Sequence, residues 1–196
     1  MLKFIASTTT IPVPKFLDLY EENGLLHLKT ERVSGMSLDD IASEAVIIHV
    51  ANYLESYVLP QLLELRHHTI GSADATLPVI PPRRITYRDE RSTWPRKTSY
   101  ITDFMFRHND LGQHYIIVDP STLDVTAIID WEFVGYYTTE FKYPIWLKPV
   151  AEQGEDRLQP DHLIKFLDST SESPKAADTN TLVRLPEGST PAVESL

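Results

Sequence analysis

Two short apolar runs near the start of the chain are separated by a turn signal. The runs at residues 15–20 (KFLDLY) and 25–33 (LLHLKTERV) flank the sequence Glu-Glu-Asn-Gly. Asn-Gly between apolar runs is a strong short-range sign of a two-residue β-hairpin. The pattern therefore predicts two antiparallel strands, after which the chain leaves the hairpin through Ser34 and Gly35.

Apolar residues then recur at helical spacing. The recurring positions are Ile41, Ala45, Ile48, Ala51, Leu54 and Val58. Ser37, followed three residues later by Asp40, forms a possible helix cap in front of them. Pro60 interrupts the pattern, and the segment 61–68 (QLLELRHH) resumes it. We expect one long helix or two collinear helices.

The second half of the chain alternates between irregular and strand-like segments. From Thr69 to about Ser99 the sequence is rich in proline and arginine and shows no periodicity, which predicts a loop. The runs YITDFMF, YIIVD and VTAIID are typical of short buried strands, and the last two predict a tight hairpin across PSTLD. From Asp168 onward, large apolar residues are scarce, and we expect a disordered tail.

Charge and cysteine content exclude several classes of function. The 196 residues carry a formal charge of −10 and no cysteine. The acidic balance argues against a nucleic-acid partner, and the lack of cysteine excludes disulfides, thiolate metal sites and a cysteine nucleophile. The apolar run at the N-terminus is too short for a signal peptide or a membrane span, so we expect a cytoplasmic protein without membrane contact.

The candidate chemistry lies in two turns that follow one another closely. The segment HNDLGQHYIIVDP holds His108 and Asp110, and the segment IIDWEF holds Asp130. Phosphoryl transfer requires a carboxylate near the acceptor hydroxyl and ligands that hold magnesium against the nucleotide phosphates. Two acids on adjacent turns supply both.

These motifs resemble the catalytic and metal-binding loops of the aminoglycoside phosphotransferase and choline kinase family. The resemblance covers most of residues 8–150, because TIPVPKFLDL and LLHLKTERVSGMSLDDI look like the last strands of that family's N-terminal lobe and its hinge. It implies an α+β fold of the protein kinase-like type in an N-terminally truncated member. Residues 1–35 would be a remnant of the N-terminal lobe and hinge, 36–167 the C-terminal lobe, and 168–196 the disordered tail.

The resemblance also implies roles for particular residues. Asp110 would orient or deprotonate the acceptor hydroxyl, and His108 would brace its loop by hydrogen bonding. Asp130 would bind Mg²⁺. The backbone around Glu31 and Val33 would face the adenine of ATP.

The chain departs from the family pattern at several points. The kinase loop has a magnesium-binding asparagine five residues after the catalytic aspartate, and this position is Tyr115. A phosphate-covering loop and its strand lysine have no counterpart, since Lys3 and Lys15 lack the required context. We therefore expect an ATP-dependent phosphotransferase of a small hydroxylated or amine-bearing metabolite that is impaired or inactive in this chain. The alternative is a non-catalytic pseudokinase-like binding module or the product of a gene fragment.

Plainer interpretations exist for the same residues. Asp110 and Asp130 are also typical of turns at strand ends. Gln113 and His114 are alternatives to Tyr115 as the side chain that points into the site, although their spacing from Asp110 differs from the family's. His67 and His68 are expected to be surface or packing residues. Packing around the segment that follows Asp130 is expected of four aromatic residues: Trp131, Phe133, Tyr136 and Tyr137. The arginines between residues 83 and 96 form either a solvated loop or a phosphate-binding patch. Whether a partner chain supplies the missing lobe stays open.

Overall fold

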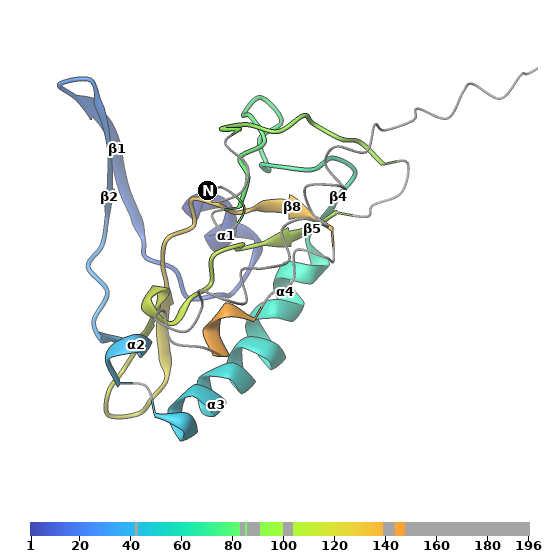
Figure 1. Cartoon of the computed structure of the whole chain (residues 1–196). Helices are drawn as coiled ribbons and strands as arrows, with labels where there is room; N and C mark the ends of the chain where they lie inside the picture. Colours follow the sequence, from blue (N-terminus) through green and yellow to red (C-terminus); the bar gives the residue numbers. More distant parts are fainter. Residues whose placement is uncertain (42, 83–84, 86–90, 100–103, 139–143, 148–196) are drawn as a thin grey trace, which may run out of the picture.

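The computed structural model describes residues 1–41, 43–82, 85, 91–99, 104–138 and 144–147. Within them the protein combines helices with three small antiparallel sheets, of two, three and three strands (Figure 1). Mixed helix and sheet content is what the sequence predicted. The assignment to a kinase-like lobe and the boundaries at residues 35 and 167 stay predictions, and the expected disordered tail lies outside the described residues.

The predicted N-terminal hairpin is present. Strand β1 (Phe16–Glu22) pairs antiparallel with β2 (Leu25–Thr30). Asn23 and Gly24 both have positive φ, 53° and 75°, which is the type I′ geometry that Asn-Gly favours. The hairpin extends away from the rest of the molecule (Figure 1).

The predicted long helix is one continuous helical stretch that changes pitch before Pro60. It consists of α3 (Glu44–Tyr53), a π-helical turn η1 (Leu54–Val58) and α4 (Leu59–Glu64). Proline lacks an N–H and its ring clashes with the carbonyl four residues earlier, so a wider turn just before it avoids a break. The expected start was wrong, because a separate short helix α2 (Leu38–Ile41) precedes α3. Ile48, expected on the buried face, is 53% exposed.

The other two sheets contain the predicted strands and three that the sequence did not reveal. In one sheet the order is β3 (Met36–Ser37), β6 (Ile116–Val118) and β7 (Val125–Ile128); in the other it is β4 (Arg66–His67), β5 (Phe104–Arg107) and β8 (Gly135–Tyr137). The hairpin of β6 and β7 confirms the prediction for that segment. The short strands β3, β4 and β8 are too brief to show alternation.

An unexpected N-terminal helix belongs to the core. Helix α1 (Leu2–Thr8) buries Ile5 completely and places the ring of Phe4 5.4 Å from that of Phe106 in β5. After the helix, the carbonyl of Pro12 accepts a hydrogen bond from Ile128 N–H at 2.8 Å. The first residues therefore contact both three-stranded sheets, through β5 of one and β7 of the other.

The described part of the segment from Thr69 to Ser99 is irregular, as expected, but it is packed. Ile70, Val79 and Trp94 are buried, and Val79 forms an isolated bridge with Trp94. Arg96 donates to the carbonyls of Ile70 and Leu77, so this arginine has a structural role. Most of the arginines in the proposed basic patch lie outside the described residues. No helix in the described part of the chain is long and apolar enough to cross a membrane.

Candidate functional site

His108 joins the two candidate loops. It follows β5, is 3% exposed, and its Nε2 lies 3.0 Å from the carbonyl oxygen of Ile129. Because a carbonyl only accepts, the proton of the neutral ring must be on Nε2. Burial lowers the pKa of His108 to about 4, while the bond to Ile129 and the charge of Asp130 act in the opposite direction. His108 is therefore neutral at physiological pH.

The residue after His108 makes a second connection. Asn109 is buried and donates from Nδ2 to the carbonyl oxygen of Phe133 at 2.8 Å. Asn109 and Asp130 both have left-handed backbone, with φ of 66° and 61°. Such conformations cost free energy for residues other than glycine, and they tend to collect where function requires a special geometry. Two turns of this kind lie against each other here.

Asp110 is half-buried in the first of these turns. Its carbonyl oxygen accepts a hydrogen bond from Gly112 N–H at 2.9 Å, which closes the turn. The hydrogen bonds of the two preceding residues hold the Asp110 turn against the Asp130 turn. The roles of both carboxylates stay predictions.

Tyr115 stands at the end of the same loop. Its carbonyl oxygen accepts from Ile129 N–H at 2.9 Å, so its backbone adjoins the residue before Asp130. Its ring centroid lies 3.8 Å from that of His114. Gln113 is fully buried and donates from Nε2 to the Trp146 carbonyl at 2.8 Å. The amide of Gln113 is thus directed to the segment around Trp146.

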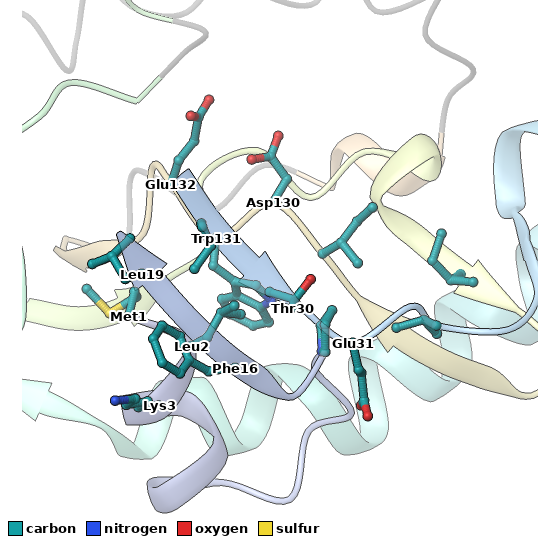
Figure 2. A pocket seen from close by; sticks show the side chains of 15 residues that line it. Met1, Leu2, Lys3, Phe16, Leu19, Thr30, Glu31, Asp130, Trp131 and Glu132 are labelled. Carbon is teal, nitrogen blue, oxygen red and sulfur yellow. The ribbon is translucent and has the colours of Figure 1, made fainter. Parts of the chain in front are cut away.

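A pocket of about 780 Å³ lies between the hairpin, α1 and the Asp130 turn. Fifteen residues line it (Figure 2): Met1, Leu2, Lys3, Pro14, Phe16, Leu19, Leu28, Thr30, Glu31, Val33, Ile117, Ile129, Asp130, Trp131 and Glu132. Three residues predicted as ligand contacts, Glu31, Val33 and Asp130, are therefore brought to one cavity. Asp110 and His108, the two residues predicted as catalytic, are not among its lining residues.

Trp131 both lines the pocket and contacts His108. Its indole N–H donates to the carbonyl of Ile128 at 2.7 Å, and its ring lies 4.6 Å from that of His108. The sequence had indicated packing for Trp131, and the structure gives it a place in the pocket wall as well.

Lys3 is a lining residue that sequence reasoning set aside. Its ammonium lies 4.1 Å from the centroid of the Phe16 ring, a cation–π contact. Lys3 reaches the pocket because Phe4 and Ile5 anchor α1 in the core. A short helix held by long-range packing leaves no local signal, so no sequence pattern could have placed this lysine.

The backbone N–H of Glu31 already has a hydrogen-bond partner within the protein. Its N–H donates to the carbonyl of Lys15 at 2.9 Å, and its carboxylate accepts from Lys15 N–H at 3.0 Å. In Figure 2 its side chain points away from Asp130. The Glu31 N–H therefore cannot also bind an adenine ring without breaking this pairing.

The acidic groups at the pocket rim are compatible with one hard cation. Figure 2 shows the carboxylates of Asp130 and Glu132 directed to the same side of the pocket. The described residues contain no cluster of three or more side chains suited to hold a metal. Mg²⁺ commonly uses one or two carboxylates and keeps water or phosphate oxygens at its other positions, so this donor set suits it when a nucleotide is present.

The sequence matches no protein-family model and no curated protein. Among solved structures, the chain is similar to the crystal structure of an aminoglycoside-3'-phosphotransferase of type VIII. The TM-score is 0.47 at 20% sequence identity, and the match covers 85% of this chain and 68% of that one. Similarity at this level does not place the chain in a family.

Proposed function

We propose that this protein binds a magnesium–adenine nucleotide in the pocket between the hairpin and the Asp130 turn, with little or no phosphotransfer to an acceptor. The supporting observation is that residues from two separate sequence motifs, Glu31 and Val33 from one and Asp130 from the other, line the same cavity. The acceptor of any residual transfer would be a small hydroxylated or amine-bearing metabolite.

The apolar wall of the pocket suits a flat heterocycle. Phe16, Leu28, Val33 and Trp131 are among its lining residues. The volume of about 780 Å³ is within the range of roughly 300–1,000 Å³ typical of ligand pockets. A base enclosed by these side chains would leave its phosphates free to extend toward the acidic rim.

Mg²⁺ would supply charge neutralisation for those phosphates. Asp130, with Glu132 beside it, is the carboxylate suited to hold the ion. Without a bound cation, the two acids at the rim would repel the phosphates, so we expect nucleotide binding to depend on magnesium.

The roles of the neighbouring loop follow from its position. Asp110 would accept the proton of an acceptor hydroxyl. His108 is neutral and buried, so its role is to position the two turns, and proton transfer falls to Asp110. The hydrogen bonds of His108 and Asn109 would keep the Asp110 turn close to the cation site.

Several features favour binding without turnover. Tyr115 offers a neutral phenol where a hard cation prefers an amide or carboxylate oxygen. The Lys3 ammonium rests on the Phe16 ring instead of being paired with a glutamate as in the kinase pattern. The absence of Asp110 from the fifteen lining residues also favours a binding module without turnover.

Thermal unfolding with ATP tests nucleotide binding, and a phosphorylation assay tests transfer to an acceptor. We expect an upward shift in Tm with ATP and Mg²⁺ together, loss of the shift in Asp130→Ala, and no acceptor phosphorylation by the wild type. If Tyr115→Asn restores transfer, the tyrosine is the principal defect. The absence of any nucleotide-dependent shift in the wild type would refute the proposal.

A further inference from the structure

The walls of the pocket come from two separate parts of the chain. The hairpin supplies one wall through Phe16, Leu19, Leu28 and Thr30, and the turn after β7 supplies another through residues 129–132. Figure 2 shows side chains of both groups around the pocket. Within the described part of the chain, β1 and β2 pair with each other and with no further strand, so strand pairing does not fix the hairpin relative to the turn. The shape of the pocket therefore depends on how the ends of the hairpin are attached.

The entry stem of the hairpin, residues 12–15, is attached to β7 through the backbone. The carbonyl oxygen of Pro12 accepts a hydrogen bond from Ile128 N–H at 2.8 Å. At the hairpin end, the stem is joined to Glu31, whose N–H donates to the Lys15 carbonyl at 2.9 Å and whose carboxylate accepts from Lys15 N–H at 3.0 Å. The bond to β7 uses backbone groups only, so it does not depend on the identity of a side chain.

The exit stem of the hairpin, residues 31–35, is attached to β7 through a side chain. Thr126 Oγ1 in β7 donates to the carbonyl oxygen of Ser34 at 2.9 Å and lies 3.2 Å from the carbonyl oxygen of Ile117 in β6. A hydroxyl has one proton, so this donor is shared between the hairpin and the sheet. Gly35 packs closely here, because an added Cβ would lie 3.1 Å from the same hydroxyl oxygen and closer still to β6. The Thr126 hydroxyl therefore lies where the exit stem, β6 and β7 meet.

We propose that Thr126 is a positioning residue for the pocket, because its hydroxyl holds the exit stem on β7 and so sets where the hairpin stands relative to the Asp130 turn. Thr126 precedes Asp130 by four residues, and β7 occupies most of the interval. The bond thus connects the hairpin to the segment that carries the candidate cation ligand. A wall that is already in place lowers the ordering cost of binding a ligand. The effect on affinity rests on the proposed nucleotide function, whereas the effect on hairpin position does not.

Two substitutions at position 126 distinguish the hydroxyl from the rest of the side chain. Thr126→Val keeps the β-branched shape that suits a strand and removes the donor, whereas Thr126→Ser keeps the donor and removes the methyl group. A role of the hydroxyl predicts an effect of the valine variant that the serine variant does not share. Thr76→Val is the matched control, because the Thr76 hydroxyl bonds to Asp74 at 2.7 Å within one exposed turn and lies outside the pocket lining.

The position of the hairpin can be measured without a ligand. The chain has no cysteine, so Glu22→Cys at the end of β1 and His49→Cys on α3 provide one pair of spin labels at exposed sites. Pulsed electron paramagnetic resonance then gives the distribution of distances between the hairpin and the helix. We expect the distribution of the labelled parent to be kept in Thr126→Ser and Thr76→Val, and to become broader or displaced in Thr126→Val. Circular dichroism of each variant checks that the fold is retained.

Titration with ATP and Mg²⁺ distinguishes a failure of this inference from a failure of the proposed function. We expect Thr126→Val to raise Kd by about threefold to tenfold, as the loss of one hydrogen bond predicts, and Thr126→Ser and Thr76→Val to change Kd by less than about twofold. A wild type that does not bind ATP with Mg²⁺ refutes the proposed function, and the distance measurement still decides whether Thr126 positions the hairpin. An unchanged distance distribution in Thr126→Val, an equal change in Thr126→Ser, or an unchanged Kd in Thr126→Val when the wild type binds would each overturn the inference.

Discussion

His108 donates from Nε2 to the carbonyl oxygen of Ile129 at 3.0 Å, and Ile129 immediately precedes Asp130. This bond joins positions that are 21 residues apart in the sequence. The turn that carries Asp110 is thereby fixed to the turn that carries Asp130. The stability of this connection can be measured independently of any ligand.

Removal of the imidazole should destabilise the protein. His108→Ala leaves the partly buried Ile129 carbonyl without its donor, and we expect the free energy of unfolding to fall by about 1–3 kcal/mol. Urea unfolding measures the change. His49→Ala, at an exposed position on α3, is the matched control and should change stability by less than about 0.5 kcal/mol. Equal effects of the two substitutions would show that the hydrogen bond from His108 to Ile129 does not contribute to stability.

The same histidine should make stability depend on pH. Its pKa is near 6.5 in the unfolded chain and about 4 in the folded protein, so the unfolded state binds the proton more readily. The contribution of His108 to the free energy of unfolding is complete above pH 6.5 and is lost as pH falls toward about 4. The maximum loss is about 3 kcal/mol.

Comparison with His108→Ala isolates this contribution from other titrating groups. The wild type and the variant should differ most in free energy of unfolding at neutral pH and converge as pH falls toward 4. A difference that stays constant over this range would contradict the neutral, buried state of His108.

The left-handed backbone of Asn109 gives a second test of the joined turns. Asn109→Ala and Asn109→Gly both remove the hydrogen bond to the Phe133 carbonyl, but only glycine tolerates φ of 66° without strain. We expect alanine to be more destabilising than glycine by about 1 kcal/mol in chemical unfolding. Identical stabilities would mean that the turn relaxes to another conformation.

Gly135 should not accept a side chain. A Cβ there would lie 2.6 Å from the carbonyl oxygen of Gly71, whose backbone forms a bridge with Tyr136 next to Gly135. Gly135→Ala should therefore lower stability by about 1–3 kcal/mol in thermal or chemical unfolding.

Gly24 provides the control for this prediction. A Cβ at Gly24 meets nothing within 4 Å, and asparagine tolerates its φ of 75°. Gly24→Asn should change stability by less than about 0.5 kcal/mol. A tolerated Gly135→Ala would contradict the close approach of β8 to Gly71.

Local signals predicted the elements that depend on local geometry. Asn23 and Gly24 specify the hairpin because the required turn needs positive φ at both positions. The predicted role of His108 as the residue that braces its loop stays a prediction, and the structure shows a hydrogen bond from His108 to the Ile129 carbonyl. The sequence signal for this role was the resemblance of the motif around His108 and Asp110.

Features set by long-range packing were beyond the sequence pattern. Helix α1 is short, and the burial of Ile5 and the Phe4–Phe106 contact hold it in place. Strand β8 was interpreted only as aromatic packing, because three residues are too few to show alternation. The pocket position of Lys3 follows from α1 and was missed with it.

Equilibrium binding of ATP, measured by isothermal titration calorimetry, tests the central claim most directly. The wild type should bind ATP in the presence of Mg²⁺ and lose this binding when the metal is chelated. Asp130→Asn should weaken binding by about tenfold or more, equivalent to about 1.4 kcal/mol. Asp124→Asn, which removes an exposed carboxylate outside the pocket, should leave it unchanged. Binding that is independent of Mg²⁺, or equally strong in Asp130→Asn, would contradict the assignment of Asp130 to the cation.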